Sequence, residues 1–282
     1  MRALITGGGG QLASDLQTLL GDQATSFSRG ELDIADTAAV DRAFADVAPD
    51  VVFNCAAFHN LDVCEVEADR AWEVNVRAVR DLASRGAKLV HLSTNYVFDG
   101  RAERPYGEDD LPSPRSIYAL TKLAGEHAAL AYGDGALVVR AAGLYGTHGS
   151  ASKGGNFVER MRTRALEQGW LKMVADQRLQ PTFTADLAAA LVDAVERGAA
   201  GTVHLTAEGA CSWLEFTEAI MELAGIDVAV EPVTTTVQPG QPDRPLNGVL
   251  ARPAADALGL PRLRPWREQL ADYLSQTAPV AR

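Results

Sequence analysis

The stretch of sequence that decides the fold is residues 2–13, RALITGGGGQLA. A short apolar run ends in four glycines, Gly7 to Gly10, and a helix-type pattern follows through Leu16 and Leu20. Glycines after a strand allow a tight turn and a close approach of the backbone to a pyrophosphate, and the next helix offers free N–H groups to it. The stretch therefore predicts a dinucleotide-binding turn at the start of a βαβ unit.

The rest of the first half repeats this alternation of strand and helix. Strands are expected over Arg2–Ile5, Ala24–Phe27, Val51–Cys55, Lys88–Leu92 and Ala136–Val139. Segments long enough for crossover helices lie between them, at Thr37–Phe44, Cys64–Leu82 and Tyr118–Leu130. Such alternation is typical of an α/β fold, here a Rossmann-type doubly wound parallel sheet, which binds ligands at the carboxyl ends of its strands.

After residue 140 the pattern loosens. We expect residues 1–145 to form the NAD(P)-binding domain, completed by about 183–208, and residues 146–282 to form mainly a smaller, discontinuous C-terminal substrate-binding lobe. Elements expected beyond residue 140 are a helix over Asn156–Leu166, a strand over Leu171–Val174, a helix from Thr184, a strand over Thr202–Leu205 and a helix opened by a capping box from Ser212 to Glu215. Irregular chain is expected over Gly143–Gly155 and Val233–Pro245.

Composition excludes several classes of protein. The 26 basic and 37 acidic side chains give a net charge of −11, which argues against a nucleic-acid partner. No run approaches the roughly 18 apolar residues of a membrane span, and the first residues lack the apolar core of a signal peptide, so we expect a cytoplasmic protein without a membrane partner. Three scattered cysteines are too few for a disulfide framework and are interpreted as reduced thiols.

The cofactor's second contact is expected where the second strand ends. An NAD-specific site places an acidic residue there to bind the ribose, and this chain has Arg29 instead. A guanidinium can pair with a 2′-phosphate, which favours NADPH, with NADH as the alternative cofactor. A solvated loop arginine is the other interpretation. Asp33 and Ile34 then follow where the adenine edge would lie.

A phenol and an ammonium are spaced for one helix face at Tyr118 and Lys122. Such a pair can donate a proton to a carbonyl oxygen as hydride arrives at the carbon. Thr94 ends the fourth strand at the same sheet edge as the glycine turn, where its hydroxyl can hydrogen-bond the same oxygen. Each feature alone also fits an ordinary helix surface or a turn cap.

These residues resemble the extended short-chain dehydrogenase/reductase family and, within it, the dTDP-4-dehydrorhamnose reductases. The resemblance covers nearly the whole chain. Matching segments are 6–12 (TGGGGQL), 54–57 (NCAA), 62–65 (DVCE), 93–100 (STNYVFDG), 118–126 (YALTKLAGE), 154–157 (GGNF), 176–177 with 181–182 (DQ and PT), and 244–245 with Leu250 (RP). Together they are more specific than the glycine turn, which many folds share.

The resemblance implies hydride transfer from NADPH or NADH to C4 of a 4-keto-6-deoxy sugar carried on a nucleoside diphosphate. Tyr118 is then the proton donor, Lys122 lowers the pKa of Tyr118 and holds the nicotinamide ribose, and Thr94 polarises the keto oxygen. The implied cofactor contacts are Gly7, Gly10, Gln11, Leu12, Arg29, Asp33, Ile34, Ala56, Ala57 and Lys122. The implied substrate contacts are Asn95, Tyr96, Gly143, Asn156 and Arg244.

The sequence departs from the family pattern at positions expected to touch the sugar. Asn95 stands where most relatives have Asp, and Gly143 stands where many have Trp, so we expect an altered sugar site. Some relatives bind Mg²⁺ at a dimer contact, but only Asp15 matches that ligand set, so no metal is assigned and a homodimer is left open. Acidic residues over 103–110 lack ligand spacing and are expected to form a solvated loop.

Two other functions remain open from the sequence. The first is an epimerase or dehydratase of the same fold, which keeps its cofactor bound and returns the hydride to the same substrate. Dehydratases usually need an additional acidic side chain beside the residue that corresponds to Thr94, and Asn95 does not supply one. A non-catalytic NADP-binding regulatory subunit shares the fold as well, although it has no need of Tyr118 and Lys122.

Overall fold

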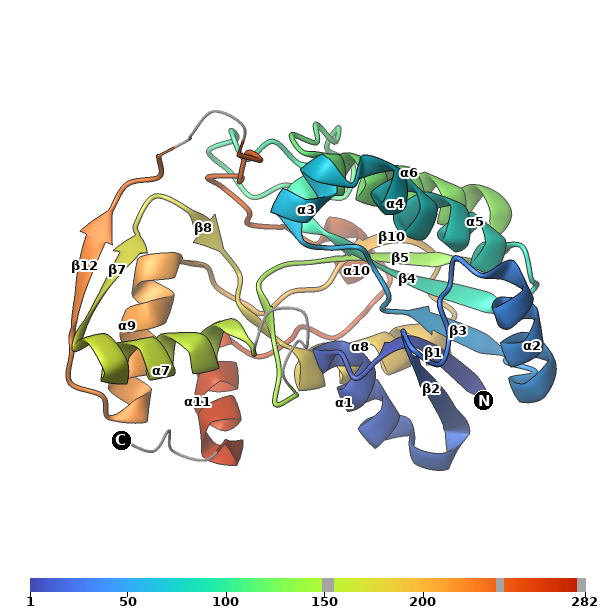
Figure 1. Cartoon of the computed structure of the whole chain (residues 1–282), viewed down its shortest axis with the longest axis horizontal. Coiled ribbons are helices and arrows are strands. Elements are labelled where there is room, and N and C mark those ends of the chain that lie inside the picture. Colours follow the sequence, from blue (N-terminus) through green and yellow to red (C-terminus); the bar gives the residue numbers. More distant parts are fainter. Residues whose placement is uncertain (149–154, 237–240, 278–282) are drawn as a thin grey trace.

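Six parallel strands form the central sheet of the computed structural model, which describes residues 1–148, 155–236 and 241–277 (Figure 1). Their order is β10-β5-β4-β3-β1-β2. The strands are β1 (Ala3–Gly8), β2 (Ala24–Ser28), β3 (Val51–Asn54), β4 (Lys88–Thr94), β5 (Leu137–Ala141) and β10 (Gly201–His204). The chain reverses its direction of winding between β1 and β3, so the carboxyl ends of these two strands flank the crevice where doubly wound sheets bind ligands.

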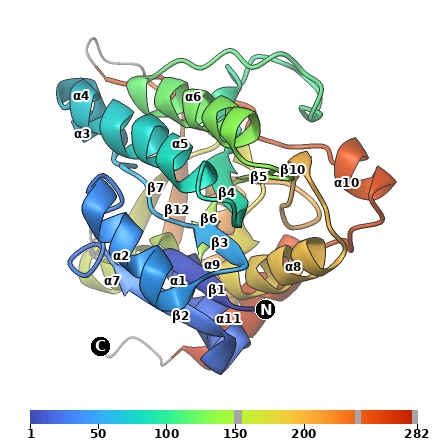
Figure 2. The same ribbon diagram turned by 90° about the vertical axis from the view of Figure 1, so that its right-hand side faces the viewer.

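Helices cover both faces of this sheet, as Figure 2 shows. The helices are α1 (Gln11–Leu20), α2 (Thr37–Val47), α5 (Ala78–Ala83), α6 (Ile117–Tyr132) and α8 (Thr184–Glu196). On one face, leucines of α1 and α8 pack against Ile5, Phe53 and Val139. On the other, Val40 of α2, residues of α5 and Ala129 of α6 pack against the opposite side of the same strands. Because both faces are buried, the central strands β3 (VVFN) and β5 (LVVRA) are mostly apolar.

The helix expected over Cys64–Leu82 is wrong as a single element. The segment forms α3 (Leu61–Val66), α4 (Ala68–Trp72), a π-helical turn η2 (Glu73–Arg77) and α5. The chain breaks at Glu67, whose φ of −107° and ψ of 51° are not helical. The π turn places Asn75 so that its amide bonds Phe58 O and Thr121 Oγ1, both at 3.0 Å. The buried residues Ala71, Val74, Ala78 and Leu82 keep three- to four-residue spacing across these breaks, so side-chain periodicity does not reveal them.

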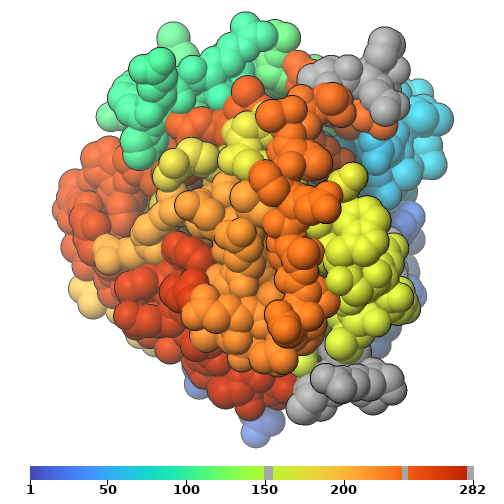
Figure 3. All heavy atoms as spheres, turned by 90° about the vertical axis from the view of Figure 1, so that its left-hand side faces the viewer, coloured from blue at the N-terminus to red at the C-terminus, as the bar shows by residue number. Residues whose placement is uncertain are grey.

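A second, smaller lobe is built mainly from residues after 155, apart from α8 and β10. Its elements are α7 (Phe157–Gln168), β7 (Trp170–Val174), β8 (Arg178–Leu179), β11 (Cys211–Ser212), α9 (Trp213–Ala224), β12 (Ala229–Val233) and α11 (Trp266–Gln276). Tyr145, Phe216 and Tyr273 lie in its core, where the Tyr145 ring contacts the other two. Figure 3 shows the outer face of this lobe, with α9 and β12 in orange beside the yellow-green α7.

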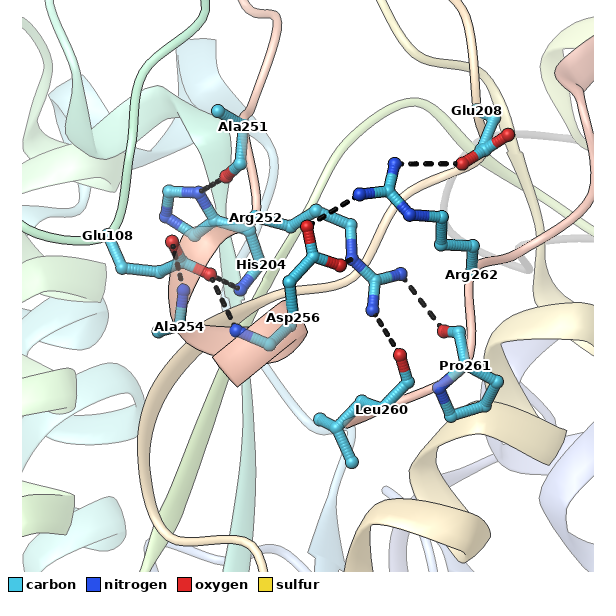
Figure 4. A network of polar contacts seen from close by, with 11 residues as sticks. Glu108, His204, Glu208, Ala251, Arg252, Ala254, Asp256, Leu260, Pro261 and Arg262 are labelled. Carbon is cyan, nitrogen blue, oxygen red and sulfur yellow. Dashed lines mark hydrogen bonds and ion pairs between the residues drawn. The ribbon is translucent and has the colours of Figure 1, made fainter. Parts of the chain in front are cut away.

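The remaining elements are short. They are η1 (Gly21–Gln23), η3 (Asn95–Val97), β6 (Leu144–Tyr145), β9 (Thr182–Phe183) and α10 (Pro253–Ala257). Helix α10 packs beside β10, and Glu108 accepts hydrogen bonds from the backbone N–H groups of His204 and Ala254 (Figure 4). The expectation of a solvated acidic loop is therefore wrong for Glu108, which bonds backbone donors, and Asp110 pairs with Arg104 at 2.7 Å.

The expected fold class is confirmed, and the expected strands and helices agree with the observed ones within a few residues, α3 to α5 excepted. The capping box at Ser212 and Glu215 is confirmed by both of its hydrogen bonds. The expected irregular stretches fall partly on residues 149–154 and 237–240, which lie outside the described residues. No helix in the described ranges is long and apolar enough to cross a membrane.

Candidate active site

One large cavity, of about 1360 Å³, lies between the carboxyl edge of the sheet and the smaller lobe. One side is formed by the glycine turn after β1, the end of β4 and the start of α6; the other is formed by residues of α7, β7 and the segment after β12. The structure therefore brings together, in one cavity, the glycine turn, Thr94, Tyr118 and Lys122.

The glycine turn has the geometry that a pyrophosphate needs. Gly7 has φ of +76°, and a Cβ there would lie 2.9 Å from the backbone of Cys55 and Ala56. Gly10 is the N-cap of α1 without a side-chain cap, so free N–H groups of the first turn face the cavity. Buried Gln11 Oε1 has no partner within the described chain. These features fit a nicotinamide dinucleotide.

Local capping positions the catalytic candidates. Ser116 caps α6 by accepting from Ala119 N at 3.2 Å, and Tyr118 and Lys122 follow on the first two turns of that helix. Thr94 ends β4, and its hydroxyl lies within hydrogen-bonding reach of the Tyr118 phenol. Lys122 is buried and donates to Leu92 O at 2.7 Å. A substrate carbonyl between Thr94 and Tyr118 would meet two hydroxyl groups.

The protein shifts the pKa values of both α6 residues. Burial lowers the pKa of Lys122 to about 8, because desolvation disfavours the ammonium more than Glu126 supports it. Burial raises the pKa of Tyr118, and the hydrogen bond from Thr94 only partly opposes this. Lys122 is not among the groups that shift the pKa of Tyr118 here, so the expected effect of Lys122 on this phenol stays a prediction.

Ser93, next to Thr94, has a different role. Its hydroxyl donates to Glu126, which also pairs with Arg140 at 2.6 Å. Both residues line the cavity, but the Ser93 hydroxyl joins a buried ion pair whereas the Thr94 hydroxyl reaches Tyr118.

The remaining cofactor candidates divide into two groups. Gly7, Gly10, Gln11, Leu12, Ala57 and Lys122 line the cavity, and Arg29, Asp33, Ile34 and Ala56 do not. Arg29 is exposed just after β2, and its charge helps to lower the pKa of Asp33. Asp33 is paired with Arg70 at 2.6 Å, and the side chain of Ile34 is buried in the core.

All five substrate candidates line the cavity, but several already have partners. Asn95 is buried and donates to Gly248 O at 3.1 Å. Asn156 caps α7 and donates to Gly146 O and to the Tyr273 hydroxyl, both at 2.7 Å. Tyr96 packs edge-on against Tyr118 and is hydrogen-bonded to Arg244. Arg244 reaches the cavity from the segment after β12.

Sequence reasoning missed the cations that the smaller lobe adds. Arg160 and Lys172 line the cavity opposite the glycine turn, from α7 and β7. Arg160 lies four residues after Asn156 on an expected helix, so helical spacing could have linked the two. Nothing in the sequence indicated that Lys172 faces the cavity.

Within the described ranges, no group of three or more His, Cys, Asp or Glu side chains could hold a metal ion.

The fold and this site define a Rossmann-type protein of the extended short-chain dehydrogenase/reductase class. A family profile described as the RmlD substrate binding domain matches residues 1–278. The chain belongs to this family.

Relatives resemble the chain over almost its full length. A dTDP-4-dehydrorhamnose reductase from Streptomyces griseus is 41% identical over 96% of this chain and 92% of that protein. The spore coat polysaccharide biosynthesis protein SpsK of Bacillus subtilis is 37% identical over 98% and 97%. The crystal structure of a dTDP-4-dehydrorhamnose reductase from Bacillus anthracis in complex with NADP has a TM-score of 0.92 at 32% identity, covering 98% and 99%.

Proposed function

We propose that the chain reduces the C4 keto group of a nucleotide-linked 4-keto-6-deoxy sugar with NADPH. The proposed substrate is dTDP-4-dehydrorhamnose and the product dTDP-L-rhamnose, with NADH as the alternative hydride donor. Reductases of this kind are among the relatives with 37–41% identity, and the related Bacillus anthracis structure holds NADP.

The observation that carries the proposal is that Thr94, Tyr118 and Lys122 share one cavity with the uncapped N-terminus of α1. When bound, the reduced dinucleotide supplies the hydride. Tyr118 donates its phenolic proton to the oxygen that becomes the alcohol, and the Thr94 hydroxyl orients that oxygen. The amine of Lys122, held by Leu92 O, keeps a hydrogen free for the cavity.

The smaller lobe supplies positive charge for the diphosphate of the substrate. Arg160, Lys172 and Arg244 line the cavity on the side away from the glycine turn. We infer that residues 1–145 with about 183–208 hold the dinucleotide, while the remaining part of 146–282 holds the nucleotide sugar. The Asn95 amide stands where many relatives have a carboxylate, and we infer that it contacts a sugar hydroxyl.

The test is NADPH oxidation by wild type and by Tyr118→Phe with dTDP-4-dehydrorhamnose. Loss of the phenolic proton should lower kcat about 100-fold or more while NADPH binding persists. Tyr132→Phe, at the exposed end of the same helix, removes a hydroxyl without touching the cavity and should leave kcat unchanged.

Near-wild-type turnover of Tyr118→Phe would contradict the assignment. Conversion of a nucleotide sugar without net NADPH consumption would instead favour an epimerase or dehydratase. Binding of NADPH without turnover of any 4-keto sugar would favour a regulatory subunit.

A further inference from the structure

A chain of buried polar side chains runs from Lys122 to the strand that carries the glycine turn. Lys122 Nζ lies 3.2 Å from His91 Nε2 on β4. His91 Nδ1 lies 3.0 Å from the Asn54 amide on β3, and that amide lies 2.7 Å from Thr6 Oγ1 on β1. All four residues are at most 2% exposed. Each hydrogen in this chain must therefore be accounted for by protein partners.

The assignment of donors and acceptors begins at Thr6. Its oxygen accepts from Ala56 N at 3.3 Å, and the one acceptor that the described residues offer its proton is Asn54 Oδ1. The Asn54 amide thus turns its oxygen to Thr6 and its N–H to His91. The opposite orientation would leave the buried Thr6 hydroxyl without an acceptor, which is costly.

The position of the ring proton of His91 follows from this assignment. Burial and the neighbouring Lys122 lower the pKa of His91 well below 6.5, so the ring is neutral. A neutral imidazole that accepts at Nδ1 carries its proton on Nε2. This N–H faces Lys122 Nζ, and a neutral amine can accept from it, whereas an ammonium has no lone pair.

We propose that Thr6, Asn54 and His91 form a positioning chain that presents an N–H to Lys122 and so favours its neutral amine. The catalytic meaning rests on the proposed function: a lysine that exchanges its proton near neutral pH can serve the proton supply of Tyr118.

Other titratable groups face Lys122 as well. Glu126, on the next turn of α6, raises the pKa of Lys122, but it is engaged by Arg140 and Ser93. The Cys55 residue, just after β3, would raise the pKa of Lys122 as a thiolate, but burial raises the pKa of this thiol to about 12 and so keeps it uncharged. Neither group replaces the N–H of His91.

The first experiment reads the His91 tautomer by NMR of protein labelled with ¹⁵N in its histidines, without cofactor or substrate. His91→Gln identifies the His91 signals by their loss. The proposal expects the proton on Nε2 at neutral pH. A proton on Nδ1 would overturn it, whatever the activity of the protein.

The second experiment changes the far end of the chain. Thr6→Val keeps the size and removes the hydroxyl, so the Asn54 amide can rotate and His91 can offer a lone pair to an ammonium. The Nδ1–H tautomer should appear, and the pH midpoint of kcat/KM for NADPH oxidation that belongs to Lys122 should rise by about one unit, the worth of one hydrogen bond. Thr6→Ser keeps the hydroxyl and should restore wild-type behaviour.

If Thr6→Val changes neither the His91 tautomer nor the pH midpoint of kcat/KM, the proposed role of Thr6, Asn54 and His91 is refuted. If Thr6→Val does not fold, the proton position on His91 in the wild-type protein is the test of the proposal. If the wild-type protein oxidises no NADPH with any 4-keto sugar, the proposed function is wrong. The His91 tautomer still tests the positioning chain in that case.

Discussion

At the scale of single residues, Gly143 shows how backbone geometry can account for a residue that the sequence connects with the substrate. Its φ is +59°, in the left-handed region, and a Cβ there would lie 3.0 Å from Leu179 Cδ1 and from Pro181 Cα. A larger side chain at this position needs movement of both neighbours. The backbone thus explains the glycine without reference to the sugar.

The corresponding prediction is that Gly143→Ala lowers the free energy of unfolding by about 2–4 kcal/mol, the sum of left-handed strain and overpacking. Gly225→Ala is the matched control, because Gly225 has φ of +65° and no atom within 4 Å of the place that an alanine methyl group would occupy. This control should lose only about 1 kcal/mol. Urea unfolding measures both. Equal losses would show that contact with Leu179 and Pro181 costs nothing.

At the scale of elements, α6 joins the site to the core of the sheet. Tyr118, Lys122 and Glu126 follow at i, i+4 and i+8 and so lie along one face of the helix. The helix packs closely on η2 because Gly125 has no side chain: a Cβ there would lie 2.2 Å from Asn75 O. The third of these three residues, Glu126, forms a buried ion pair with Arg140 of β5.

We predict that Arg140→Met lowers the free energy of unfolding by about 3–5 kcal/mol, since it leaves the Glu126 carboxylate buried without its partner. The control is Arg197→Met, which removes an exposed arginine paired with Asp193 at 2.6 Å and should cost under about 1 kcal/mol. Denaturant unfolding of both variants measures the difference. A loss for Arg140→Met no larger than the control would contradict the buried-pair argument.

At the scale of the whole molecule, the long connection between β4 and α6 is attached to the C-terminal segment. Tyr106 donates its backbone N–H to Val249 O at 2.9 Å, and its backbone oxygen accepts from Ala251 N at 2.7 Å. Glu108 accepts from the backbone of His204 and of α10, and Arg252 holds the end of α10 by bonding Leu260 O and Pro261 O (Figure 4). The Glu108 contacts connect segments about 100 to 150 residues apart, so they attach the β4–α6 connection to β10 and α10.

We predict that Glu108→Ala lowers the free energy of unfolding by about 1.5–3 kcal/mol, because a charged acceptor of backbone donors is lost. Amide hydrogen exchange at His204 and Ala254 should accelerate. Glu103→Ala makes the same change of charge in the same loop at an exposed residue and should alter neither quantity. Unchanged exchange at Ala254 in Glu108→Ala would rule out this role.

The sequence by itself determined the order of elements, the glycine turn and the Tyr118–Lys122 spacing. These follow from local rules: alternation of apolar runs, glycine after a strand, and i to i+4 spacing on a helix. The same rules placed Thr94 at a strand end facing the turn, because parallel strands end at one edge of the sheet.

Only the tertiary structure decided which side chains have a partner already and which remain available to a ligand. It bonded the Ser93 hydroxyl to Glu126 and placed the Thr94 hydroxyl within reach of Tyr118. It kept Arg29 outside the cavity lining and brought Arg160 and Lys172 to that lining from the second lobe, with Lys172 already paired with Glu231. Residues 6, 54, 91 and 122 meet in one hydrogen-bonded chain because β1, β3, β4 and α6 are neighbours in space. The physical reason is that local pattern specifies which face of an element is buried, whereas hydrogen-bond partners and pKa shifts depend on groups that other elements bring to that face.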